Sequence, residues 1–104
     1  MSIGNLTKLK ILSLNNNKLT KLNEFIGNLA ALNDLYLNYN QLTKIPEWVS
    51  NLSKLTNLNL RHNQLTELPV SLVKLRKLEK LNLIDNPIKS LPTELSHLIK
   101  IVKF

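Results

Sequence analysis

Apolar and polar positions follow a pattern along this chain that repeats every 23 residues. Two sets of positions carry the repeat: the leucines Leu12, Leu35, Leu58 and Leu81, and the asparagines Asn17, Asn40, Asn63 and Asn86. Each unit fits LxxLxLxxNxLxxL, with isoleucine at some leucine positions, and a second apolar trio follows, as in Ile26, Leu29 and Leu32. A unit of this length is too small to bury its own apolar side, so the period predicts a solenoid of stacked units.

The repeat fills nearly the whole chain, which predicts a single domain. Four full units span residues 9–31, 32–54, 55–77 and 78–100. Residues 1–8 read as the tail of an earlier unit, because the IGNL at 3–6 recurs at 26–29, and residues 101–104 begin another. The length of 104 residues, with 43% hydrophobic and 20% charged residues, agrees with one ordinary globular domain.

The LxL segment of each unit predicts a short β-strand. Alternate side chains of an extended chain point to opposite faces, so the two leucines face the core and the residue between them faces solvent. We expect strands of successive units to pair in parallel. The asparagine lies in the bend after each strand, where its amide can satisfy backbone groups that leave the sheet. The sequence therefore predicts a structural ladder made of Asn17, Asn40, Asn63 and Asn86.

The second half of each unit predicts short helical or 3-10 turns on the convex side of the solenoid. Proline follows the apolar residue at position 14 in three units, as Pro46, Pro69 and Pro92. Its ring suits an extended or turn backbone from which no strand hydrogen bond is required. The first unit has Asn23 at this position, which predicts a looser turn.

These features resemble the leucine-rich repeat family. The motif is highly specific, and the Leu-Pro pairing is similar to that of the 23-residue subclass, which is common in bacterial proteins, including those of spirochaetes, and in eukaryotic signalling scaffolds. The resemblance implies an α/β leucine-rich repeat solenoid, with a short parallel β-sheet on the concave face and 3-10 or irregular turns on the convex face.

The outward residues that differ between units are candidates for recognising a partner. Tyr36 and Tyr39 fall in one unit, and Arg61 and His62 follow one strand away, at a spacing of ~4.8 Å. Tyrosine, arginine and amide side chains are typical of recognition surfaces. The sequence predicts a concave partner-binding surface made of Tyr36, Asn38, Tyr39, Asn59, Arg61, His62 and Asp85. The alternative interpretation is that tyrosine is simply a favourable outward residue of a strand.

The sequence offers no catalytic, metal or cofactor site. Tyr39, His62 and Asp85 align in one row, but a His-Asp pair supplies at most two metal ligands and no nucleophile, and His97 falls on the convex side. There are no cysteines, and the two glycines, Gly4 and Gly27, form no phosphate-binding loop. We therefore expect a protein that is not an enzyme.

The formal net charge of +7 is carried partly by a line of basic residues. One repeat position holds Lys8, Lys54, Lys77 and Lys100, with Lys74 and Arg76 beside it. This line could attract an acidic protein, an anionic glycan or lipid headgroups, although solubility alone also explains it. No aromatic residues are interleaved with it, which argues against nucleic acid.

Two further apolar features leave self-association open. Phe25 and Trp48 share position 17 on the convex side, where they either form an exposed patch or cover the neighbouring turn. Ile3, Leu6, Ile101 and Phe104 lie near the ends of the chain, where a solenoid normally carries polar caps. Uncapped ends predict association between copies.

The preferred hypothesis is a non-catalytic module that binds a protein partner through its concave face. The alternatives are a structural or self-associating segment of a larger repeat protein, and a binder of an anionic host or cell-surface ligand. The N-terminal residues do not resemble a signal peptide, and no apolar run is long enough to span a bilayer. We expect a cytoplasmic location by default, and secretion if the chain is a fragment of a longer protein.

Overall fold

The computed structural model describes residues 7–104, which form five strands separated by four 3-10 helices. The strands are β1 (Ile11–Ser13), β2 (Asp34–Tyr36), β3 (Asn57–Asn59), β4 (Lys80–Asn82) and β5 (Val102–Lys103). The helices are η2 (Glu24–Asn28), η3 (Glu47–Asn51), η4 (Val70–Lys74) and η5 (Thr93–Lys100). No helix of this described part of the chain is long and apolar enough to cross a membrane.

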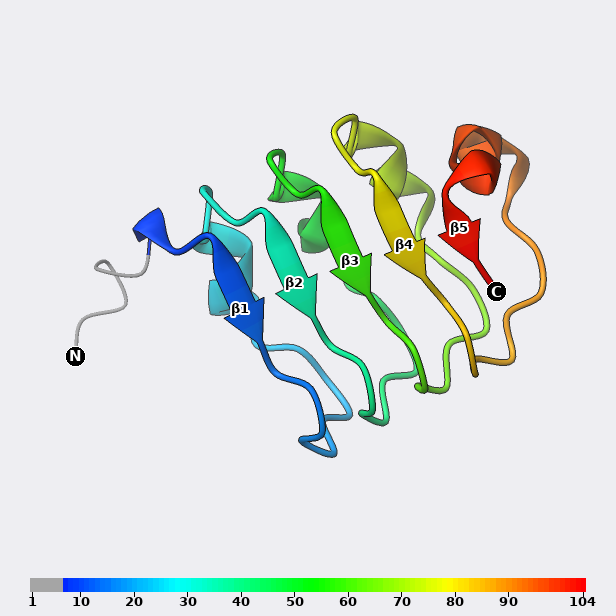
Figure 1. Cartoon of the computed structure of the whole chain (residues 1–104), viewed down its shortest axis with the longest axis horizontal. Coiled ribbons are helices and arrows are strands. Elements are labelled where there is room, and N and C mark those ends of the chain that lie inside the picture. The colour runs from blue at the N-terminus through cyan, green and yellow to red at the C-terminus, as the bar shows by residue number, and fades with distance from the viewer. Residues whose placement is uncertain (1–6) are drawn as a thin grey trace.

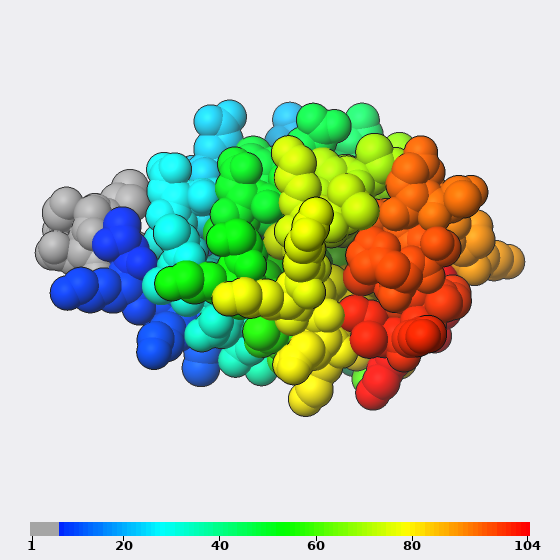
Figure 2. All heavy atoms as spheres, turned by 90° about the horizontal axis from the view of Figure 1, so that it is seen from above, coloured from blue at the N-terminus to red at the C-terminus, as the bar shows by residue number. Residues whose placement is uncertain are grey.

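The five strands form one parallel sheet in the order β1-β2-β3-β4-β5 (Figure 1). Leu12 lies opposite Leu35, Leu35 opposite Leu58, and Leu58 opposite Leu81, so equivalent positions of successive repeats are neighbours. The repeats stack as successive bands along the long axis of the molecule (Figure 2). A parallel sheet on one side and 3-10 turns on the other agree with the predicted solenoid.

The leucines of the repeat form a continuous core between the sheet and the convex turns. Leu35, Leu58 and Leu60 have no exposed surface, because each packs against the equivalent leucines of the repeats before and after it. Leu9, Leu12, Leu14 and Leu19 of the first described repeat pack against this core but are only partly buried, whereas Leu22, Ile26 and Leu29 of the same repeat belong to the buried core. Burial of this kind stabilises by about 25 cal/mol per Å² of apolar surface, so stacking is the main source of stability.

Each convex helix begins after an extended residue that sets its direction. Pro46, Pro69 and Pro92 precede η3, η4 and η5, with φ between −62° and −69° and ψ between 137° and 155°. Asn23 precedes η2 with nearly the same angles, φ −75° and ψ 134°. The prediction of a looser turn in the first repeat is therefore wrong. The Asn23 side chain accepts a hydrogen bond from the backbone N–H of Phe25 at 3.0 Å, an N-cap that proline cannot supply.

The last strand departs from the 23-residue period. A strict period would place Phe104 opposite Leu81, whereas the structure places Val102 there and Lys103 opposite Asn82. The chain reaches the sheet two residues early because η5 runs for eight residues, with a kink at Leu95. As a result, Lys103 continues an outward row of the sheet.

The asparagine of each repeat joins its own bend to the bend before it. The Oδ1 atom of Asn40 accepts from the backbone N–H groups of Asn17 and Leu19 at 3.0 and 2.9 Å. Its Nδ2 donates to the carbonyls of Leu14 and Leu37 at 3.0 and 2.9 Å. One buried side chain thus pairs with four backbone groups, and it supplies the acceptor for the two N–H groups, whereas the Leu14 and Leu37 carbonyls also accept from the Nδ2 atoms of Asn17 and Asn63.

The later repeats have the same arrangement, but the number of backbone groups that pair with each asparagine differs along the solenoid. Asn63 and Asn86 each accept from one backbone N–H of the preceding repeat and donate to carbonyls of both repeats. Asn17 is exposed, and within residues 7–104 its Nδ2 donates to the nearby carbonyls of Leu14 and Asn15 alone. The asparagines that lie between two described repeats therefore carry more of the backbone pairing than Asn17.

Candidate functional site

The candidate residues lie at and just beyond the ends of the strands on the outward side of the sheet. The register places Tyr36 beside Asn59, and Asn59 beside Asn82. The Tyr36 hydroxyl accepts a hydrogen bond from the Asn57 Nδ2 at 3.2 Å, which links two neighbouring strands on the same face. Tyr36 is half-buried, so its ring is held in place rather than free in solvent.

The remaining candidates lie in the segment that follows each strand. The sequence predicts them as outward strand residues, but each of these strands ends after three residues. Parallel backbone pairing nevertheless continues, since the Tyr39 N–H donates to the Arg61 carbonyl and the His62 N–H to the Ile84 carbonyl, both at 2.8 Å. Neighbouring repeats therefore remain side by side through this segment.

The chain turns sharply at one repeat position in this segment. Asn16, Tyr39, His62 and Asp85 all have positive φ, between 59° and 63°. Asparagine, aspartate and histidine are enriched in this left-handed conformation, whereas tyrosine is not. Tyr39 is thus the residue of this set that fits its backbone conformation least well.

The side chains at this turn form a row of contacts across three repeats. The rings of Tyr39 and His62 stack with centroids 4.8 Å apart and an angle of 22° between their planes. The His62 Nδ1 and the Arg61 Nε lie 3.8 and 3.9 Å from the same Asp85 carboxylate oxygen. These separations are too long for hydrogen bonds, and the side chains are exposed, so the charged contacts add little stability. The row is an accessible cluster of aromatic, cationic and anionic groups.

The other two predicted residues have different environments. The Asn59 Oδ1 accepts from the backbone N–H of Arg61 at 3.0 Å, so its amide is oriented by the turn that follows β3. Asn38 is half-buried, and its carbonyl accepts from the Asn16 N–H at 3.1 Å. The structure thus brings Tyr39, Arg61, His62 and Asp85 into one cluster, with Tyr36, Asn38 and Asn59 in the adjoining rows.

A hollow of about 440 Å³ opens beside the stacked rings. Its lining residues are Lys18, Tyr39, Asn40, Gln41, His62, Asn63 and Gln64. Lys18, Gln41 and Gln64 are not among the predicted outward residues, because each follows the ladder asparagine at a position that the repeat assigns to the bend. Their shared repeat position was the signal that could have found them.

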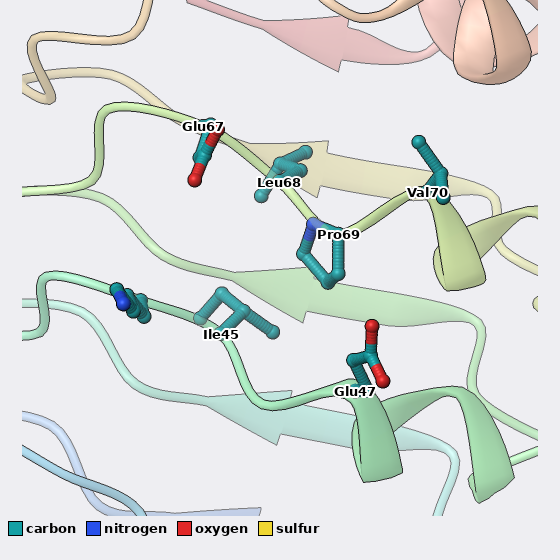
Figure 3. A pocket seen from close by; sticks show the side chains of 7 residues that line it. Ile45, Glu47, Glu67, Leu68, Pro69 and Val70 are labelled. Atoms are coloured by element: carbon teal, nitrogen blue, oxygen red, sulfur yellow. The ribbon is translucent and has the colours of Figure 1, made fainter.

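Phe25 and Trp48 do not form a freely exposed patch. Both are partly buried against the core, and the Trp48 ring covers Gly27, where an added Cβ would lie 3.0 Å from Trp48 Cε3. This supports the interpretation that Trp48 covers the neighbouring turn. The convex side instead carries shallow grooves between repeats, one of about 340 Å³ in which Glu47 points toward Pro69 of the next repeat (Figure 3).

The site has no arrangement typical of a metal centre. Within residues 7–104, no three His, Cys, Asp or Glu side chains converge in a way that could hold a metal ion. The groups that contact the His62 and Asp85 pair are the Tyr39 ring and the Arg61 guanidinium. Such a cluster can hydrogen-bond, stack and pair charges, which are the interactions of recognition.

Comparison with known proteins agrees with this geometry. A family model described as a leucine-rich repeat region matches residues 1–104. A solved structure of a leucine-rich repeat protein from Leptospira interrogans has 37% sequence identity and a TM-score of 0.81, and the match covers 92% of this chain. This chain spans 25% of that protein's length. Among curated proteins, none matches the chain significantly.

These matches confirm the predicted α/β solenoid and its resemblance to spirochaete repeat proteins. Proteins with this fold typically act as interaction modules rather than as catalysts. The chain belongs to the leucine-rich repeat family.

Proposed function

We propose that this chain is a non-catalytic module that binds a protein partner through its concave face. The binding centre consists of the stacked pair Tyr39 and His62, the neighbouring Arg61 and Asp85, and the adjoining residues Tyr36, Asn38 and Asn59. The observation that carries the proposal is the left-handed backbone of Tyr39, at φ 59°, combined with an exposed, stacked ring.

The conformation of Tyr39 argues for a role beyond stability. The left-handed conformation costs a residue such as tyrosine roughly 1–2 kcal/mol. The equivalent position in the first repeat holds Asn16, which tolerates this conformation. Stacking with an exposed histidine returns only part of that cost. Residues held in unfavourable backbone conformations cluster at functional sites, so Tyr39 is a candidate for function.

The chemistry of the cluster fits a protein partner. Tyrosine and arginine dominate the residues that carry most of the binding energy at protein interfaces. Tyr39 is 41% exposed, and the hollow beside it is open to a side chain of the partner. Asn40 and Asn63 on the floor of that hollow are already committed to backbone groups, so Gln41, Gln64 and Lys18 remain to hydrogen-bond a ligand.

The test begins with a display library of folded domains or peptides selected against the 104-residue chain. Affinities of the selected binders are then measured by calorimetry with purified variants. We expect Tyr39→Ala and Tyr36→Ala each to weaken binding by ~1–3 kcal/mol, with the fold intact by circular dichroism.

Trp48→Ala is the matched control, because it removes an aromatic ring from the convex side. Binders that tolerate both tyrosine substitutions and lose affinity with Trp48→Ala would place the working surface on the convex side and contradict the proposal.

A further inference from the structure

A second hollow lies on the same face, nearer the C-terminal end of the sheet. It has a volume of about 430 Å³ and is lined by Asn57, Asn59, Glu79, Lys80, Leu81, Asn82, Lys100, Ile101 and Lys103. The register explains why these residues meet: Asn57 lies opposite Lys80, and Asn59, Asn82 and Lys103 follow one another along a single row. Lys103 joins this row only because β5 departs from the 23-residue period.

Two asparagines present hydrogen-bond donors to this hollow. The Asn59 Oδ1 accepts from the backbone N–H of Arg61, and the Asn82 Oδ1 accepts from that of Ile84, both at 3.0 Å. Each carboxamide is therefore oriented with its oxygen occupied. Within residues 7–104, the Nδ2 atoms of Asn59 and Asn82 have no hydrogen-bond acceptor. The row thus offers two fixed N–H₂ groups.

The charge of the hollow is strongly unbalanced. Lys80, Lys100 and Lys103 contribute three positive charges, and Glu79 is the single acidic residue of the lining. The ion pairs formed by the described part of the chain both involve Asp85, so none of these three ammonium groups has a carboxylate at ion-pair distance. Three cations and two amide donors converge with little to neutralise them.

We infer that this hollow, defined by Lys80, Lys100, Lys103, Asn59 and Asn82, binds carboxylate side chains of an acidic, extended segment of a protein partner. The inference rests on the proposed function, since it names the chemistry of the segment that lies beside the tyrosine cluster. Lysines and amide N–H₂ groups donate to carboxylate oxygens, and the electrostatic field of the lysines speeds the encounter.

The geometry favours an extended peptide as the occupant. Lys80 and Lys103 lie on adjacent strands and two residues apart along them, so their backbones are roughly 8 Å apart, from spacings of ~4.8 Å and ~3.3 Å per residue. Alternate side chains of an extended peptide lie ~6.6 Å apart on one side, within reach of flexible lysines. The Asn57 Nδ2 donates to the Tyr36 hydroxyl, and this bond orients the carboxamide. The Asn57 Oδ1 can then accept a hydrogen bond from a peptide N–H.

The experiment measures binding of a capped, fluorescein-labelled hexaglutamate peptide to the 104-residue chain by fluorescence polarisation at low salt. We expect saturable binding that weakens as salt is added. The double variant Lys80→Gln/Lys103→Gln should bind at least about fivefold more weakly. The matched control, Lys21→Gln/Lys44→Gln, removes the same charge from the grooves of the convex side and should change affinity by less than about twofold.

A second pair of variants tests whether hexaglutamate binds in this hollow or is attracted by the net positive charge of the chain. Asn82→Asp keeps the oxygen that accepts from the Ile84 N–H, so the turn is retained, but it replaces the amide donor by a negative charge. We expect this variant to lose hexaglutamate binding. Asn28→Asp, on the exposed end of η2, adds the same charge away from the hollow and should bind nearly as the original chain does.

Three results would overturn the inference. Equal losses in the hollow variants and their controls would show attraction by net charge alone. Unchanged affinity in Lys80→Gln/Lys103→Gln would place binding elsewhere. Binding of a heparin hexasaccharide through these residues, with none of hexaglutamate, would assign the hollow to a sulfated glycan. Because hexaglutamate is measured without the partner protein, each of these results leaves the tyrosine-centred proposal to its own test.

Discussion

The ring of Tyr39 stacks on the ring of His62, with centroids 4.8 Å apart, while both residues hold left-handed backbone conformations at φ 59°. Two aromatic rings from adjacent repeats are thus presented from the same sharp turn. The backbone fixes the direction of each side chain, and the parallel pairing of the repeats fixes their separation. The stack is therefore assembled before any partner arrives, which lowers the entropy lost on binding.

The strain at Tyr39 predicts a difference between two substitutions. Tyr39→Asn and Tyr39→Ala both remove the ring and its stacking, but asparagine tolerates the left-handed conformation and alanine does not. We expect Tyr39→Asn to be more stable than Tyr39→Ala by roughly 1 kcal/mol, measured as the free energy of unfolding in urea. The same two substitutions at Tyr36, whose φ is not positive, provide the control. Equal stability of the Tyr39 pair would show that this turn relaxes at no cost.

The ladder predicts a second difference. Asn40→Ala would leave the backbone N–H groups of Asn17 and Leu19 without their acceptor and would remove one of the two side-chain donors to the Leu14 and Leu37 carbonyls. Within residues 7–104, the Asn38 side chain has no such role. Asn40→Ala should therefore destabilise by ~1–3 kcal/mol more than Asn38→Ala.

Asn17→Ala gives the stability loss expected for a ladder asparagine that makes few backbone contacts. Asn17 is exposed and, in the described part of the chain, donates within its own bend alone, so Asn17→Ala should lower the free energy of unfolding by much less than Asn40→Ala. Denaturant melts of the three variants check the order. A loss from Asn17→Ala as large as that from Asn40→Ala would contradict the graded ladder.

The sequence predicts the repeating part of this structure well because each repeat solves the same physical problem. Leucines at fixed spacing must be buried, and the asparagine must satisfy the bend, so strands, core and convex turns follow from the period. The departures come from contacts that periodicity does not describe. Asn23 replaces a proline by capping η2 with its side chain, and η5 shifts the register of β5 by two residues.

Less of the candidate site could be predicted from the sequence, because its geometry also depends on features that the period does not describe. Alignment of the repeats places Tyr39, His62 and Asp85 in one row, as the structure does. An alignment gives no backbone angle, so the positive φ of Tyr39 could not be predicted from the sequence. A strict 23-residue period would place Lys103 opposite Lys80, in another row of the sheet, so the hollow that Lys103 completes does not follow from the repeat. The repeated residues determine the sheet, the core and the convex turns, whereas the residues that differ between repeats determine the chemistry of the outward surface.

Close packing between η2 and η3 predicts coupling between Gly27 and Trp48. A Cβ at position 27 would lie 3.0 Å from Trp48 Cε3, which belongs to a rigid ring, so one of the two must move. We expect Gly27→Ala to destabilise by about 1–2 kcal/mol and to shift the fluorescence of the single tryptophan.

A double-mutant cycle checks the cause. In the Trp48→Leu background, the smaller side chain leaves room for the new methyl group, and Gly27→Ala should become neutral or stabilising. An unchanged loss in that background would assign the effect to the backbone of η2 instead.

The last helix and strand predict association of the isolated 104-residue chain. Ile99 is 59% exposed and Phe104 is 44% exposed, and β5 pairs on one side only, with β4. Apolar side chains beside an unpaired strand edge favour contact with another copy. We expect sedimentation to show concentration-dependent association from about micromolar concentration upward. Ile99→Lys should suppress it, whereas Lys100→Gln, which changes the neighbouring residue without removing apolar surface, should not. A clean monomer across a hundredfold range of concentration would mean that this end of the solenoid stays solvated.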